Sequence, residues 1–259
     1  IQGKLIVQYL YRFVVVRILI SLTRYFIFNF FGKFKTLYNP EDKKMSNVTV
    51  YETGKTGLSH NLVYRNLPEK FNFKKIKKKL LQFAGKKAEL LVYPLKSIDF
   101  FNFNKFKVLS IGPRVEAELM TIRSMGFKWK NIKAIDLHSY SSLIELGDMH
   151  NIKYENNSFD VIISGWTLRY STNINLALSE MLRVCKTGGI ISIGFTYVKN
   201  ASIDSNLKTN KTAENELYST DQIKDFYKNN IRNVYFEFDA YRENPSINRQ
   251  SIIVLRIKK

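Results

Sequence analysis

The sequence predicts an α/β fold: a doubly wound, mostly parallel β-sheet preceded by a basic, mainly helical extension. From about residue 106 onward, short apolar runs alternate with helical segments, the pattern of parallel strands covered by helices on both faces. The composition, 45% hydrophobic with 12 Gly and 5 Pro in 259 residues, is that of a folded globular protein. Residues 1–107 hold 21 Lys and Arg against 6 Asp and Glu, whereas residues 108–259 hold 20 against 16. We therefore expect a basic aromatic extension over 1–105 and a domain over 106–259.

The first predicted element is a helix over residues 5–31, an apolar stretch that Arg12, Arg17 and Arg24 interrupt. A membrane span is disfavoured, because one Arg near the bilayer centre costs roughly 2.5 to 3.5 kcal/mol. Two alternatives stay open. The helix lies on a membrane surface or a partner with its arginines reaching back toward the head groups, or it packs on the main domain.

A second helix is predicted over residues 71–84, where apolar side chains recur at helical spacing and lysines occupy most of the other face. It is either an ordinary surface helix with a solvated lysine face or a basic amphipathic helix seated on lipid or phosphate.

The domain itself is predicted from the alternation of apolar runs and helical spacing. Strands are expected over 106–111, 132–137, 143–147, 159–164 and 189–195, and helices near 115–125, 174–184 and 220–229. Two more strands are expected near 233–238 and 251–257, the last as an antiparallel partner in the sheet. The segment 198–218 is expected to be a substrate lid or a loose loop.

Three residues at predicted strand ends indicate a nucleoside site. Gly112 follows the first strand, where a tight turn leads into a helix whose free N–H groups accept an anion. Asp136 closes the second strand, where a carboxylate can accept the hydroxyl groups of a ribose, and Asp148 follows the third. Each aspartate alone is as readily a turn residue or helix cap, but their order on consecutive strand ends favours a ligand pocket.

The ordered blocks VLSIG, AIDL, GDMHNIKYENNSFDVIISGWTL and LRVCKTGGIISIGF, within residues 107–195, resemble the class I S-adenosylmethionine-dependent methyltransferases. The resemblance implies a Rossmann-like fold and S-adenosylmethionine as the cofactor. It implies that Gly112 borders the methionine part of the cofactor, Asp136 its ribose, and Asp148 with Met149 its adenine. It also implies that Ser164, Gly165 and Trp166 line the methyl-transfer region.

The sequence departs from the family pattern in two places. Arg114 and Glu116 stand where the family has further glycines, and we expect Arg114 to pair with the cofactor carboxylate and Glu116 with its ammonium group. The alternative is a plain helix start at which the acidic residues favour the helix dipole. Between Asp136 and Leu143 a short linker replaces the usual helix, so we expect Leu137, His138 and Tyr140 to form one wall of the adenine pocket.

Catalysis in such a site is mainly the placement of an activated methyl donor, and a general base is needed only if the acceptor must lose a proton. The candidates are His138, His150 and Tyr170, with Tyr197 behind them. No metal site is expected, and the single cysteine, Cys185, excludes a cysteine-rich zinc site and fits a cytoplasmic location.

The predicted function is methyl transfer to a small molecule or to a lipid- or glycan-linked acceptor, with the basic extension holding the protein peripherally on an anionic membrane face. One alternative is a catalytically degenerate Rossmann-like binding module, and another is an RNA-directed methyltransferase that uses the basic region. Nucleic acid is the less favoured partner. Ser164, Gly165 and Trp166 stand where methyltransferases acting on base amino groups have an Asn/Asp-Pro-Pro-Tyr/Phe element.

Overall fold

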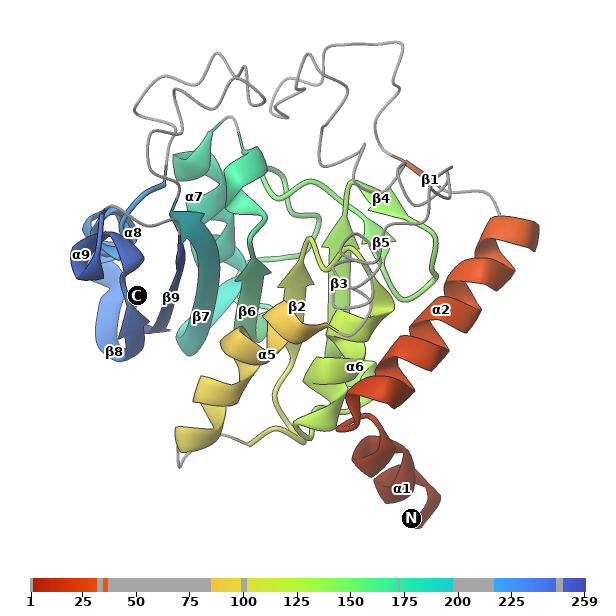
Figure 1. The fold of residues 1–259 in the computed structure, drawn as a ribbon. Helices are drawn as coiled ribbons and strands as arrows, with labels where there is room; N and C mark the ends of the chain where they lie inside the picture. Colours follow the sequence, from red (N-terminus) through yellow and green to blue (C-terminus); the bar gives the residue numbers. More distant parts are fainter. Residues whose placement is uncertain are drawn as a thin grey trace.

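The fold is centred on one seven-stranded β-sheet, seen in a computed structural model that describes residues 2–31, 35–36, 85–98, 102–171, 173–197, 217–245 and 249–259 (Figure 1). The order across the sheet is β5-β3-β2-β6-β7-β9-β8. The strands are β2 (Val108–Ile111), β3 (Ile132–Asp136), β5 (Glu145–Leu146), β6 (Phe159–Gly165), β7 (Cys185–Tyr197), β8 (Ile231–Phe238) and β9 (Arg249–Ile257). Every strand predicted from residue 106 onward is present, with bounds that shift by a few residues.

Strand directions confirm the predicted mostly parallel sheet. β5, β3, β2, β6 and β7 pair in parallel, whereas β9 runs antiparallel to both β7 and β8. In the register, Ser110 lies opposite Ala134 of β3 and Ile163 of β6, so the carboxyl ends of these strands meet at one edge. Ligands bind at this edge in open α/β sheets.

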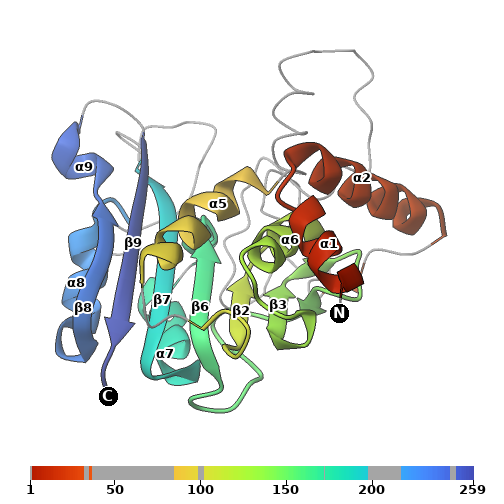
Figure 2. The ribbon, with the colours of Figure 1, turned by 90° about the horizontal axis from the view of Figure 1, so that it is seen from below.

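Helices cover both faces of the sheet (Figure 2). On one face lie α5 (Lys86–Val92), η1 (Tyr93–Ser97) and α6 (Glu116–Ser124), and on the other lie α7 (Ile174–Val184) and α8 (Thr220–Tyr227). The predicted helices near 115–125, 174–184 and 220–229 are thus confirmed. The short elements are η2 (Trp129–Asn131), η3 (Leu168–Tyr170), η6 (Lys228–Asn230) and α9 (Ala240–Glu243).

Local sequence explains where the helices begin. Asn173 accepts a 2.9 Å hydrogen bond from the Leu176 N–H at the start of α7. Ser219 and Gln222 form a capping box at the start of α8. Each cap satisfies backbone donors that have no partner within the helix.

The domain core begins before residue 106. Leu91, Val92, Leu95 and Ile98 are buried with the sheet residues of one face, and the Ser192 hydroxyl donates a 2.9 Å hydrogen bond to the Leu91 carbonyl. Residues of the segment 85–98, which falls within the extension predicted over 1–105, therefore contribute to the core on this face of the sheet. The predicted helix over 71–84 lies outside the described residues.

The apolar N-terminal stretch forms two helices, α1 (Gln2–Leu10) and α2 (Val14–Phe31), where one helix over 5–31 was predicted. Both lie against α6, so the packed alternative describes their position (Figure 2). None of the helices in the described part of the chain has the length and apolar character of a transmembrane segment. After α2, β1 (Lys35–Thr36) pairs with β4 (His138–Ser139), two residues beyond Asp136.

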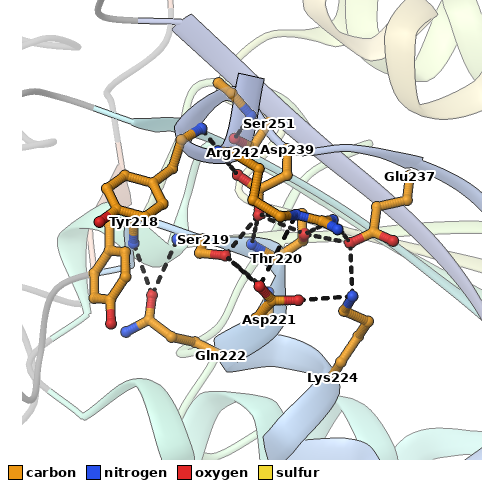
Figure 3. A network of polar contacts seen from close by, with 12 residues as sticks. Tyr218, Ser219, Thr220, Asp221, Gln222, Lys224, Glu237, Asp239, Arg242 and Ser251 are labelled. Carbon is orange, nitrogen blue, oxygen red and sulfur yellow. Dashed lines mark hydrogen bonds and ion pairs between the residues drawn. The ribbon is translucent and has the colours of Figure 1, made fainter. Parts of the chain in front are cut away.

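A buried carboxylate joins the C-terminal elements (Figure 3). Asp239 is only 4% exposed and accepts hydrogen bonds from the Ser219 hydroxyl (2.6 Å), the Thr220 N–H and hydroxyl (both 2.8 Å) and the Tyr241 N–H (2.9 Å). Burial opposes ionisation, but these hydrogen bonds prevail and lower the pKa of Asp239 to about 2. One side chain thereby fixes the start of α8 and the start of α9 at the end of β8.

Candidate functional site

The turn after β2 requires glycine at position 112. Gly112 has φ +66°, and a β-carbon there would lie 2.4 Å from Cγ2 of Thr167. The Gly112 N–H donates a 2.8 Å hydrogen bond to the Ile135 carbonyl, and the Thr167 hydroxyl donates one of 2.9 Å to the Ile111 carbonyl. The ends of β2 and β3 and the loop after β6 are thus held together at the carboxyl edge.

Arg114 takes a backbone conformation that favours glycine. Its φ is +55°, in the left-handed region, although Arg carries a β-carbon. The Arg114 N–H donates a hydrogen bond of 3.1 Å to Oδ2 of Asp136. The loop therefore keeps a glycine-type path at this position, and it binds the first of the two predicted acidic groups.

Glu116 is fully buried and its carboxylate is already paired. It contacts the Arg24 guanidinium of α2 and accepts a hydrogen bond from the Ser141 hydroxyl. The Glu116 N–H donates a 3.2 Å hydrogen bond to the Tyr140 hydroxyl. This geometry does not support the prediction that Glu116 binds the cofactor ammonium group; Glu116 joins α2 to the loop after β2.

Tyr140 belongs to the same buried cluster as Glu116. Burial, with a further contribution from the Glu116 carboxylate, raises the pKa of Tyr140 well above its ordinary value, so its hydroxyl stays protonated. Its hydroxyl faces the start of α6, which gives it a structural contact in addition to the pocket wall predicted for it.

Asp148, after β5, forms a chain of polar contacts with His150 and Ser171. Oδ1 of Asp148 lies 2.6 Å from Nδ1 of His150 and accepts a 2.9 Å hydrogen bond from the His150 N–H. Nε2 of His150 lies 2.7 Å from the Ser171 hydroxyl. Burial would raise the pKa of Asp148, but the two hydrogen bonds from His150 hold it below its ordinary value, so the carboxylate is ionised.

The same contacts decide the role of His150. Its side chain is buried and both ring nitrogens have partners, an arrangement that does not support the predicted general base. The ring instead orients the Asp148 carboxylate at the edge of the sheet.

The end of β6 brings the predicted methyl-transfer residues under α5. A β-carbon on Gly165 would lie 3.2 Å from Leu91, and the Trp166 N–H donates a 2.6 Å hydrogen bond to the Gly194 carbonyl. Trp166 has φ +59°, and Nζ of Lys87 lies 4.9 Å from the centre of its ring. Ser164 Oγ and Trp166 Nε1 are buried and have no hydrogen-bond partner within the described residues.

Glu118, in the first turn of α6, is a further site candidate. The carboxyl group makes no hydrogen bond or ion pair with another described residue, and it lies within electrostatic range of Arg114, Asp136 and Lys87. Burial raises the pKa of Glu118 well above its ordinary value; the two cations counteract this and Asp136 adds to it. Its position two residues after Glu116 was the only sequence signal.

The other predicted residues lie nearby with different exposures. Leu137 and Tyr170 are half-buried, Met149 is buried in the core, and the His138 backbone forms β4 while its side chain lies outside the description. The Tyr197 hydroxyl donates a 2.9 Å hydrogen bond to the Pro245 carbonyl. The described residues hold no group of three or more His, Cys, Asp or Glu that could bind a metal ion.

The strand order defines an α/β protein in which Gly112, Asp136 and Asp148 lie at or just after the carboxyl ends of β2, β3 and β5. Residues 124–193 match the family model described as a methyltransferase domain. Over 54 residues the chain is 43% identical to demethylmenaquinone methyltransferase of Desulfitobacterium hafniense (strain Y51), a match that covers 20% of this chain and 21% of the relative. The chain thus aligns with about a fifth of the length of that curated relative.

Solved structures of similar fold include methyltransferases. One is an S-adenosylmethionine-dependent methyltransferase from Aquifex aeolicus, 19% identical, with a TM-score of 0.44, covering 73% of this chain and 100% of that one. Another is the CurJ carbon methyltransferase, 14% identical, with a TM-score of 0.48, covering 78% of this chain and 64% of that one.

The match over residues 124–193 supports the class I S-adenosylmethionine-dependent methyltransferase that the sequence predicted. The same match indicates S-adenosylmethionine as the cofactor. The residues present fit the group: an ionised carboxylate follows β5, the Asp136 carboxyl group lies at the end of β3, and an acidic and a basic side chain lie near the loop after β2.

Proposed function

We propose that this protein transfers the methyl group of S-adenosylmethionine to a small molecule or to a lipid- or glycan-linked acceptor, at a membrane face. The principal observation in support is the arrangement at the carboxyl edge. The left-handed loop after β2 is hydrogen-bonded to Asp136, and Asp148 follows the neighbouring strand β5. The bound cofactor supplies a sulfonium-activated methyl group, so the protein needs chiefly to position donor and acceptor.

The roles of the acidic residues follow from their chemistry. The Asp136 carboxylate accepts the ribose hydroxyl groups, as carboxylates at this place do in dinucleotide-binding folds. The ionised Asp148, oriented by His150, accepts from the adenine amino group. Met149 contributes apolar surface beside the ring.

The amino-acid end of the cofactor carries both a carboxylate and an ammonium group, and the site offers both charges. Lys87, over the Trp166 ring, and Arg114 supply positive charge, and Glu118 supplies a carboxyl group within electrostatic range of both. Charge-assisted hydrogen bonds of this kind are among the strongest in proteins. Since the Glu116 carboxylate is already paired with Arg24, we assign the ammonium group of the cofactor to Glu118. We assign the cofactor carboxylate to Lys87 and Arg114.

The acceptor is proposed as a class only. The acceptor named for the Desulfitobacterium relative is demethylmenaquinone, and that compound is one probe for this protein. If the acceptor must lose a proton, Tyr170 and His138 remain the candidate bases, because both ring nitrogens of His150 are engaged.

Calorimetry with S-adenosylhomocysteine, the demethylated cofactor, tests the proposal. We expect saturable binding by the full chain, about tenfold or more weaker in Asp136→Ala, because a hydrogen bond between charged and neutral groups contributes roughly 1.5 to 3 kcal/mol. Asp225→Ala, which changes an exposed carboxylate of α8, is the matched control and should bind as the wild type does.

Transfer of a labelled methyl group to membrane lipids, to demethylmenaquinone, to a small-molecule extract or to RNA then identifies the acceptor. Binding of the cofactor without transfer to any of these would favour the degenerate binding module. Absence of cofactor binding would refute methyl transfer altogether.

A further inference from the structure

The polar side of α2 faces the protein interior. Arg17, Ser21 and Arg24 recur at intervals of four and three residues, which places them on one side of the helix. Arg17 and Ser21 are fully buried. Arg17 pairs with Glu89 of α5 and donates to the carbonyls of Tyr11 (2.8 Å) and Arg12 (3.3 Å), and Arg24 pairs with Glu116. The two guanidinium groups that would be least tolerated in lipid are therefore neutralised by the domain.

The exposed surface of α1, α2 and the turn between them is mostly apolar. The described residues include eighteen exposed large hydrophobic side chains, and nine of them fall within residues 6–27. These nine, which we call the apolar face, are Ile6 (58% exposed), Val7 (41%), Tyr9 (55%), Leu10 (41%), Phe13 (49%), Val15 (64%), Leu19 (58%), Phe26 (51%) and Ile27 (51%). So dense a group of exposed apolar side chains in one short segment marks an interaction site.

The charge of the segment indicates an anionic partner. No Asp or Glu occurs before Glu41, whereas Lys and Arg occur six times over the same residues, four of them in addition to the paired Arg17 and Arg24. Arg12, beside the apolar face, is exposed. Leu, Ile, Phe and Tyr flanked by basic residues are the composition of helices that lie in the head-group region of anionic bilayers.

We propose that α1 and α2 lie on an anionic lipid bilayer, with the apolar face inserted at the head-group boundary. The lipid contact stands apart from methyl transfer, but its use in presenting an acceptor rests on the proposed function. α2 is attached directly to the site, because Arg24 pairs with the first residue of α6 and β1 pairs with β4 near Asp136 (Figure 1). The bilayer contact therefore sets the distance between the lipid surface and the cofactor loop.

Flotation of the full chain with vesicles tests the proposal. We expect the wild type to float with vesicles of three parts phosphatidylcholine to one part phosphatidylglycerol, and less with phosphatidylcholine alone. Val15→Glu/Leu19→Glu should lower the bound fraction about tenfold or more, since each substitution removes a large apolar side chain from the contact. Leu176→Glu/Val234→Glu, which changes two exposed apolar residues away from the apolar face, is the matched control and should float as the wild type does.

Thermal unfolding followed by circular dichroism checks that both double variants are folded. The milder Leu19→Ser variant should lose part of the vesicle binding without loss of structure. Equal flotation of the two double variants would overturn the proposal. A wild type that does not float would also overturn it. In that case, a dimer that Val15→Glu/Leu19→Glu dissociates would identify a second copy as the occupant of the apolar face, and binding of RNA would identify nucleic acid. Flotation by a chain that binds no S-adenosylhomocysteine would leave the lipid contact standing and refute only the proposed function.

Discussion

The backbone N–H of Arg114 donates a 3.1 Å hydrogen bond to the carboxylate of Asp136, joining the loop after β2 to the end of β3. This contact needs the left-handed backbone at Arg114, where φ is +55°. A side chain with a β-carbon is unfavourable in that conformation by roughly 1 to 2 kcal/mol, so the loop is maintained against a local strain.

Arg114→Gly should therefore leave the free energy of unfolding unchanged or raise it by up to about 1 kcal/mol, since the gain in backbone freedom of the unfolded chain offsets part of the relief. Arg114→Val should lower it by about 1 to 2 kcal/mol, because a β-branched residue fits this region worst. Urea unfolding of the three proteins measures the difference. Equal stability of the Gly and Val variants would contradict the strain.

The buried Arg17–Glu89 pair makes a second prediction. Arg17→Met should lower the free energy of unfolding by about 3 kcal/mol, because Glu89, whose side chain is only 14% exposed, is left without its charged partner. Arg17→Met/Glu89→Leu should recover part of that loss. Arg12→Met, at an exposed position, should change stability by no more than about 0.5 kcal/mol. If the losses of unfolding free energy in Arg17→Met and Glu89→Leu simply add in the double variant, the pair does not couple α2 to α5.

Asp239 predicts a pH dependence. Its pKa in the folded protein is about 2, below the ordinary value of 3.8, so the unfolded state binds the proton more tightly. The carboxylate therefore stabilises the fold above about pH 4, by about 2 kcal/mol, and this contribution is lost as the pH falls toward 2. Asp239→Asn should lower stability at pH 7 and flatten the slope between pH 4 and 2. Urea unfolding at pH 7, 4 and 3 checks this, and an unchanged slope in the variant would contradict it.

The proposed contacts to the amino-acid end of the cofactor can be separated from those to its nucleoside. Lys87→Met and Glu118→Gln should each weaken the binding of S-adenosylhomocysteine about tenfold, the effect of losing one hydrogen bond to a charged group. Neither should change the affinity for 5′-methylthioadenosine, which lacks the amino and carboxyl groups. Calorimetry with both ligands measures this, with Lys86→Met as the matched control. Equal losses for the two ligands would mean that these residues only support the fold.

Much of the sheet could be predicted from sequence, because each strand is a short, nearly continuous apolar run and each helix between them keeps one apolar side. The places of Asp136 and Asp148 at or just after strand ends could be predicted for the same reason, because the end of each apolar run marks the end of a strand. The partners of those side chains were not predictable. The His150 ring is held between Asp148 and Ser171, and Arg24 pairs with Glu116. Both arrangements depend on contacts between elements far apart in the sequence.

The N-terminal helices illustrate the opposite limit. Periodicity alone places Arg17, Ser21 and Arg24 on one side, and the usual expectation is that such a side faces water. It faces the protein because Glu89 and Glu116 come from elements that only the folded domain brings there. The break between α1 and α2, where the carbonyls of Tyr11 and Arg12 accept from Arg17, likewise depends on that tertiary position.

The place of β9 between β7 and β8 imposes an order on assembly. β8 is made before β9, yet its neighbour in the sheet is β9. During synthesis, β8 (Ile231–Phe238) therefore has no strand to pair with until β9 (Arg249–Ile257) has left the ribosome. Only then can β9 pair with β7 and β8 join the sheet through β9.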